Sequence, residues 1–93
     1  MANLTDIPES LAATGWQISE DNKSIHKVFK FADFRDAMSY MVRVSFEAEA
    51  ANHHPEWLNV YNRVETTLTT HDTGGLTQND VNLAEAMDKI YQK

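Results

Sequence analysis

Three of the four histidines of this 93-residue chain fall in two short segments, at His53-His54 and at His71. An imidazole gains or loses its proton near neutral pH and can therefore serve as either an acid or a base. Two adjacent imidazoles are costly to protonate together, because each cation disfavours the next. One histidine should therefore keep its proton while its neighbour stays neutral. This combination suits an elimination, in which one group protonates a departing hydroxyl and another removes an N–H proton.

Glu49 is the carboxylate that we expect to support these histidines. It lies four residues before His53, so both side chains can share one face of the last helical turn. It also falls near an apolar stripe, where an acid without a partner is costly to bury. The sequence leaves open which imidazole is the acid and which the base, and whether His71 is the true partner of His53 or of His54.

The long helix that must position the histidine pair is predicted from Asp33 to about Asn52. Pro55 restricts His54 to an extended backbone, which ends the helix just before the pair. Charged side chains are expected on the solvated side of this helix. Apolar positions at steps of three and four predict one buried stripe, made of Phe34, Met38, Met41, Ser45 and Ala48.

The remaining elements place His71 at the end of a strand. We expect a short helix that Asp6 caps and a hairpin with strands at about 16–18 and 25–31. Two further strands are expected at 57–61 and 64–70, joined by a tight connection at Asn62-Arg63, with one long strand as the alternative. Residues 73–75 read as a loop, and Thr77 caps a last helix that has Asp80 in its first turn. The order α-β-β-α-β-β-α predicts an α+β fold, with a four-stranded antiparallel sheet and helices packed on one face. Residues 1–93 should form a single domain.

Composition excludes several classes of function. The net charge is −6, with eight basic residues scattered among fourteen acids, so direct nucleic-acid binding is not expected. The absence of cysteine excludes a disulfide scaffold, a zinc ribbon and a thiol nucleophile. No signal peptide and no segment long enough to span a bilayer is visible, so we expect no membrane partner and a cytoplasmic location.

A metal site is the main chemical alternative. Glu49, His53, His54 and His71 would form a plausible set of ligands. Neighbouring histidines seldom both reach one ion, however, and the chain has no H-E-x-x-H pattern. No serine lies in a Gly-x-Ser-x-Gly elbow, and three glycines in the whole chain do not make a phosphate-cradling loop. From the residues alone we therefore do not expect a metal site.

The same residues carry a family resemblance. The chain is similar to the pterin-4a-carbinolamine dehydratases over nearly its whole length. The similarity is carried by a set of spaced residues, by the residues around the histidines and by the closing Asp80-Val81-Asn82-Leu83-Ala84. The spaced set consists of Glu49, His53-His54-Pro55, Tyr61, His71 and Asp80. The family removes water from a tetrahydropterin hydroxylated at C4a, the product left by aromatic amino-acid hydroxylases. The resulting quinonoid dihydropterin can then be reduced and used again.

The resemblance implies a role for each matching residue. His53, His54 and His71 would be the acid–base histidines, with Glu49 and Asp80 as supporting acids. The pocket for the pterin would be lined by Asn52, Thr69, Thr70 and Asp72, and Trp57 would form a wall against the flat ring. The residue pattern alone fits Trp57 equally well as a strand residue that packs into the core. The family uses no metal or cofactor, so the pterin is purely a substrate.

The resemblance also implies self-association. Family members commonly form tetramers, so we expect a homo-oligomer, a dimer of dimers. Animal members double as dimerisation partners of a homeodomain transcription factor, which makes a protein-binding or transcriptional-cofactor module without required catalysis the alternative function. One departure is visible, since the residue before the histidine pair is often acidic in the family and is Asn52 here. Asparagine can hydrogen-bond a pterin edge but adds no charge beside a histidine.

Overall fold

One antiparallel sheet and three α-helices make up the computed structural model, which describes residues 3–92. In chain order the elements are α1 (Glu9–Ala12), β1 (Gln17–Ile18), β2 (Ile25–Lys30), α2 (Phe34–Ala51), β3 (Glu56–Val60), β4 (Arg63–Leu68), the short 3₁₀ helix η1 (His71–Thr73) and α3 (Gln78–Tyr91). The predicted α+β class and the order α-β-β-α-β-β-α are both confirmed.

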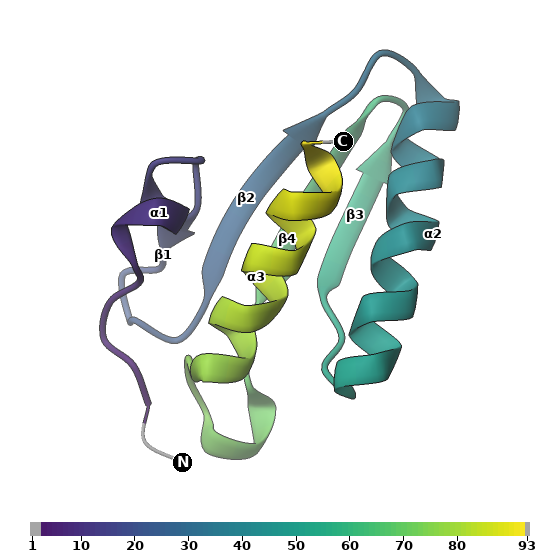
Figure 1. Ribbon diagram of the computed structural model, residues 1–93. Helices are drawn as coiled ribbons and strands as arrows, with labels where there is room; N and C mark the ends of the chain where they lie inside the picture. Colours follow the sequence, from purple (N-terminus) through teal and green to yellow (C-terminus); the bar gives the residue numbers. More distant parts are fainter. Residues whose placement is uncertain (1–2, 93) are drawn as a thin grey trace.

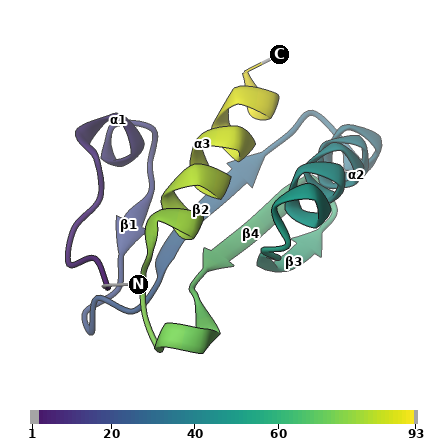
Figure 2. The same ribbon diagram turned by 60° about the horizontal axis from the view of Figure 1, so that its bottom comes forward.

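The strands lie side by side in the order β1-β2-β4-β3, and every neighbouring pair is antiparallel. The hairpin β3–β4 therefore inserts its second strand next to β2, and β3 becomes an edge. Helices α2 and α3 both lie across one face of the sheet (Figures 1 and 2). The two views also show that the C-terminal end of α2 and the N-terminal end of α3 lie at the same end of the molecule, near the end of β4.

Alternation along the strands separates the covered face of the sheet from the open one. On β4, Val64, Thr66 and Leu68 are fully buried, and successive side chains of a strand point to opposite faces. Val64 and Leu68 meet Leu76, Ala84 and Met87, together with the buried residues of α2, in one hydrophobic core. No helix covers the other face of the described sheet (Figure 2), so its middle strands present polar residues such as Glu65 and Thr67.

The predicted buried stripe of α2 is wrong for most of its length. The residues that α2 buries are Ala37, Tyr40, Val44 and Ala48, while Phe34 and Met38 are exposed. Small and aromatic residues face the sheet because α2 packs beside α3 there. A second apolar row at steps of four is left in solvent. It consists of Phe34, Met38, Val42 and Phe46.

The caps of the helices show where local sequence rules held. Asp33 caps α2 through a hydrogen bond from the Asp36 amide, and Thr77 caps α3 as expected. The first helix begins after Pro8, so the prediction that Asp6 caps it is wrong. Instead the Asp6 carboxylate accepts a hydrogen bond from the Ile7 amide.

Two further details complete the fold. The tight β3–β4 connection lies at Tyr61 and Asn62 rather than at Asn62-Arg63, and Tyr61 has a φ of 50°. Within the part of the chain that the structure describes, no helix has the length and apolar character needed to cross a membrane.

A buried ion pair ties α3 to the sheet on the covered side. Lys27 Nζ lies 2.7 Å from Asp88 Oδ1, and both side chains are almost completely buried. The same carboxylate accepts hydrogen bonds from the Trp16 indole and the Thr14 hydroxyl. Removing one member of such a pair costs about 3–5 kcal/mol, because the other charge is left buried without a partner. This network fixes α3 against the sheet. The site described below depends on the start of the same helix.

Candidate active site

His53 is held by a buried carboxylate on α3. Its Nε2 atom lies 2.5 Å from Asp80 Oδ1, and the side chain of Asp80 is completely buried while that of His53 is 11% exposed. An ionised carboxylate can only accept hydrogen bonds, so Nε2 is the donor. The contact joins residues 27 positions apart in the sequence.

Asp80 owes its orientation to the start of α3. Its Oδ2 atom accepts from the Thr77 amide at 3.0 Å and from the Thr70 hydroxyl at 2.8 Å. The Thr77 hydroxyl in turn accepts from the Asn79 amide. The bond from the Thr77 amide to Asp80 is one half of a capping box, in which the Thr77 side chain also caps the first turn of α3. Asp80 is therefore both a helix cap and the partner of His53. Because both of its oxygens are engaged, His53 is held in one orientation.

The end of α2 sets the direction of the two adjacent imidazoles. Asn52 adopts a left-handed backbone with a φ of 52°, a conformation that asparagine tolerates better than most residues. The His53 amide then bonds back to the Ala48 carbonyl at 3.0 Å. This turn separates the side chains of the pair, since His53 points to Asp80 while His54 Nε2 lies 2.9 Å from Glu49 Oε1.

Glu49 therefore differs from its expected place in two respects. It pairs with His54 rather than with His53, and its side chain is 81% exposed rather than buried. The physical reason is the left-handed residue at Asn52, which breaks the four-residue spacing that a continued helix would have kept. Glu49 follows the buried Ala48 in the chain, but its own side chain is in solvent.

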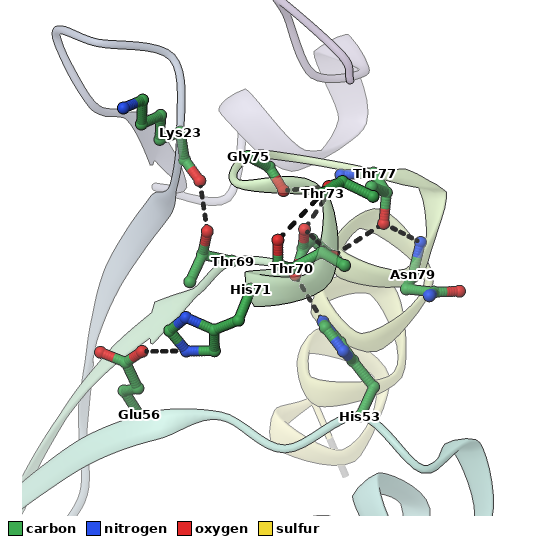
Figure 3. Close-up of polar contacts among 11 residues, drawn as sticks. Lys23, His53, Glu56, Thr69, Thr70, His71, Thr73, Gly75, Thr77 and Asn79 are labelled. Atoms are coloured by element: carbon green, nitrogen blue, oxygen red, sulfur yellow. Dashed lines mark hydrogen bonds and ion pairs between the residues drawn. The ribbon is translucent and has the colours of Figure 1, made fainter. Parts of the chain in front are cut away.

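His71 stands on the opposite side of the site, at the first position of η1. Its Nε2 atom lies 3.0 Å from Glu56 Oε2 on β3 (Figure 3). Both side chains are well exposed, at 80% and 57%. Figure 3 shows His53 and His71 entering the same region from the α2–β3 connection and from the end of β4.

The three imidazoles share one open cavity of about 220 Å³. Its lining consists of Asn52, His53, His54, Thr69, Thr70, His71 and Asp72. Sites for small molecules are concave, and they carry a small number of placed polar groups. A cavity of this size has room for one bicyclic ring but not for a dinucleotide.

Most of the residues predicted for the site line this cavity. Thr69 is fixed by a hydrogen bond of 2.5 Å from its hydroxyl to the Lys23 carbonyl, and Thr70 holds Asp80 from behind the site. Three predicted residues do not line it, namely Glu49, Trp57 and Asp80. Glu49 and Asp80 reach the site through His54 and His53, whereas Trp57 does not contact these histidines through a hydrogen bond. It lies on the edge strand β3, where it is half-buried and packs against the core.

The histidine and carboxylate side chains of the site are not arranged as the ligands of a metal ion. Among residues 3–92, no group of three or more His, Cys, Asp or Glu side chains is close enough to hold a metal ion. Each imidazole instead has its own carboxylate: Asp80 for His53, Glu49 for His54 and Glu56 for His71. Hydrogen bonds of this kind fix both the tautomer and the orientation of an imidazole.

Glu56 is the residue near the site that the sequence did not single out. The only signal was its place directly after Pro55, at the start of a strand next to the one that leads to His71. Recognising the contact requires the register of β3 with β4, and strand patterning alone does not supply that register.

Comparison with known proteins identifies the family of the chain. The family described as "Pterin 4 alpha carbinolamine dehydratase" matches residues 2–90. The chain belongs to the pterin-4a-carbinolamine dehydratase family. A Rhizobium johnstonii protein, whose name assigns it to these dehydratases, is 53% identical over 88 residues, which cover 95% of this chain and 81% of that protein. A Novosphingobium aromaticivorans protein with the same name is 49% identical over 96% of this chain and 86% of its own length.

Solved structures extend the likeness to the fold. The crystal structure of a transcriptional coactivator/pterin dehydratase from Brucella melitensis has a TM-score of 0.84 and 38% identity, covering 97% of this chain and 99% of that one. A pterin dehydratase-like protein identified as a RuBisCO assembly factor in the alpha-carboxysome has a TM-score of 0.71 at 15% identity, covering 83% and 89% of the two chains. The second likeness shows the fold alone.

Proposed function

We propose that the chain dehydrates a 4a-hydroxytetrahydropterin to the quinonoid dihydropterin by histidine acid–base catalysis, in the recycling of tetrahydrobiopterin. The C4a–O bond breaks and the departing oxygen takes a proton from an acid. The neighbouring ring N–H gives its proton to a base, and the electron pair left behind forms the C=N bond. Water leaves, nothing is oxidised or reduced, and the two protons exchanged with the protein cancel.

One observation carries this proposal: three imidazoles surround one cavity, and each has its own carboxylate partner. Because each Nε2 donates to a carboxylate, Nδ1 is the nitrogen left to exchange a proton. A neutral imidazole can take the N–H proton at Nδ1, and a protonated one can give a proton to the hydroxyl. His53, His54 and His71 are therefore the proposed acid–base groups, with Asp80 and Glu49 as supporting acids.

The remaining polar lining supports binding of a flat, uncharged heterocycle. Asn52 offers both donor and acceptor atoms, and Thr69 and Asp72 flank the opening beside His71. No Lys or Arg side chain lines the cavity, as its lining residues show. A neutral pterin ring, with its alternating donors and acceptors, matches this lining better than a phosphorylated ligand does.

The deciding experiment is a dehydration assay with the wild-type protein. A chemically generated 4a-hydroxytetrahydropterin loses water slowly by itself, and the loss can be followed by ultraviolet absorbance. We expect a clear acceleration by the wild type and an acceleration at least about a hundredfold smaller with His53→Ala, the usual scale for loss of one acid–base group. The absence of any acceleration by the wild type would sink the enzymatic proposal. The protein-binding or transcriptional-cofactor role would then be the better one.

We also propose that the chain forms a homo-oligomer, a tetramer built as a dimer of dimers. Two separate surfaces support this. The apolar row of α2 leaves Phe46 69% exposed, and within the described sheet β3 pairs with β4 alone, so its outer edge is free. Apolar rows and free strand edges are surfaces that self-association covers. Two different surfaces give two different interfaces, as a dimer of dimers requires.

Two further predictions from the sequence accompany this proposal. Residues 1–93 are proposed to form a single domain, which limited proteolysis would check by leaving one resistant fragment. The protein is proposed to act in the cytoplasm, where reduced pterins are used, and cell fractionation would check this.

A further inference from the structure

We infer that Glu56 is a positioning residue for His71, a role that rests on the dehydratase function proposed above. His71 Nε2 and Glu56 Oε2 lie 3.0 Å apart (Figure 3). His71 is the only imidazole of the site that comes from the β4 side of the cavity among the described residues. Its carboxylate partner comes from strand β3, whereas the acids that serve His53 and His54 come from helices α3 and α2.

The register of the sheet explains why the two side chains meet. Glu56 is the first residue of β3 and lies opposite Thr67 of β4. Strand β4 ends at Leu68, and the chain reaches His71 three residues later, at the start of η1. The Glu56 side chain therefore projects from the edge strand toward the segment that leaves the neighbouring strand. A shift of one residue in this pairing would turn the carboxylate to the other face of the sheet.

The exposure of the pair defines what Glu56 can do. With side chains 80% and 57% exposed, the contact adds little to the stability of the fold. Its effect is to select one arrangement of a mobile imidazole. The carboxylate accepts a hydrogen bond from Nε2–H, so the neutral ring carries its lone pair at Nδ1. The same bond restricts rotation of the side chain. Without Glu56, His71 would sample other tautomers and rotamers, and fewer encounters with the pterin would be productive.

The test combines an enzymatic and a spectroscopic readout on three variants. Glu56→Ala removes the acceptor, Glu56→Gln keeps an acceptor oxygen without the charge, and Glu65→Ala is the matched control. Glu65 is another glutamate of the same sheet and pairs with Arg63 rather than with a histidine. The tautomer of His71 is read from its ring ¹⁵N chemical shifts in protein labelled at histidine, assigned with His71→Asn.

We expect wild-type His71 to be the Nε2–H tautomer when neutral, and Glu56→Ala to show a mixture of both tautomers. In the dehydration assay, Glu56→Ala should lower kcat about fivefold, the equivalent of one exposed charged hydrogen bond, with KM changed less than about twofold. Glu56→Gln should retain most of the Nε2–H form and an intermediate kcat. Glu65→Ala should match the wild type in both readouts.

Two results would overturn the inference. One is an unchanged His71 tautomer in Glu56→Ala, and the other is an equal loss of kcat in Glu56→Ala and Glu65→Ala. If the wild type did not accelerate dehydration at all, the proposed function would fail, and the placement of Glu56 in that reaction would fail with it. The ¹⁵N spectra distinguish this case, because a tautomer change in Glu56→Ala would still establish that Glu56 orients His71.

Discussion

The two carboxylate oxygens of Asp80 bond to different groups, one to His53 of the site and the other to residues around the start of α3. Oδ1 lies 2.5 Å from His53 Nε2, while Oδ2 accepts from the Thr77 amide and the Thr70 hydroxyl. Since the side chain is completely buried, none of these partners can be replaced by bulk water. The start of α3 and the orientation of His53 therefore depend on the same carboxylate.

Asp80→Asn should consequently lower both activity and stability. An amide keeps one acceptor oxygen but places an NH₂ group where a second acceptor is needed, so one buried donor loses its partner. We expect the free energy of unfolding to fall by about 1–3 kcal/mol and kcat to fall about 10- to 100-fold. Urea unfolding followed by circular dichroism and the dehydration assay measure the two effects.

The matched variants separate the two roles of Asp80. Thr77→Ala removes the cap hydroxyl and should cost about 1 kcal/mol of stability, with a small effect on kcat because Asp80 still reaches His53. His53→Ala should do the reverse, with a large loss of kcat and a smaller loss of stability. Equal activity of Asp80→Asn and wild type would contradict the orienting role of Asp80.

Contacts between residues close in the sequence could be predicted from it, whereas contacts between distant residues mostly could not. Thr77 and Asp80 are three positions apart, and the sequence predicts Thr77 as the cap and Asp80 in the first turn because helix starts follow local rules. The convergence of His71 with the histidine pair was expected from a spaced motif. The partners of the imidazoles were not all predicted, since Asp80 and Glu56 reach His53 and His71 only through the packing of α3 and the register of the sheet.

The wrong expectations for α2 have a similar cause. Hydrophobic periodicity identified a helix, but α2 has two apolar rows, one against the sheet and one in solvent. A sequence pattern gives the spacing of such rows and not the direction in which each points. The prediction that Glu49 shares a helical face with His53 is wrong for a more local reason. The left-handed backbone of Asn52 ends the helical spacing before His53.

The exposed dyad of Glu49 and His54 should matter less than the buried one. Its side chains are 81% and 57% exposed, and water competes for both partners. We expect Glu49→Gln to lower kcat by less than about fivefold and to change the free energy of unfolding by less than about 1 kcal/mol. Parallel assays of Glu49→Gln and Asp80→Asn check this order. A larger loss of kcat for Glu49→Gln would mean that self-association buries the dyad.

A charge in the exposed apolar row of α2 should prevent self-association. Val42→Glu and Phe46→Glu each place a carboxylate in a row that the proposed interface covers, and burying an unpaired charge is costly. We expect the wild type to elute as a tetramer and both variants as smaller species, measured by size-exclusion chromatography with light scattering. Arg43→Glu, which changes the charge on the solvated side of the same helix, should leave the tetramer intact. A monomeric wild type would contradict the proposal.

Removal of metal ions should leave the reaction unaffected. Each imidazole Nε2 is engaged with a carboxylate, and the described side chains contain no cluster of three potential ligands. We expect the same dehydration rate before and after dialysis against a chelator. Elemental analysis of the purified protein gives the independent check, since zinc at one equivalent per chain, lost together with activity, would be incompatible with a mechanism that uses histidines alone.

Tyr40 should make the fold sensitive to alkaline pH. Burial, with the negative charge of Asp88 as a second cause, raises the pKa of Tyr40 far above its ordinary value of 10.0. Its hydroxyl also donates to the Met87 carbonyl at 3.2 Å. Above pH 10.0 the unfolded chain loses the phenolic proton while the folded chain keeps it. The free energy of unfolding is therefore unaffected by this group at lower pH and falls as the pH rises past that value.

Tyr40→Phe isolates this contribution, because every other titrating group is the same in both proteins. The variant loses a hydrogen bond and should be less stable than the wild type near neutral pH. Above about pH 10 its free energy of unfolding should decline less steeply, by up to about 1.4 kcal/mol per pH unit, so the difference between the two proteins narrows. Urea unfolding across this range measures both curves. Parallel curves up to the alkaline limit would show that Tyr40 ionises in the folded protein, which its burial against Phe29 and Phe31 should prevent.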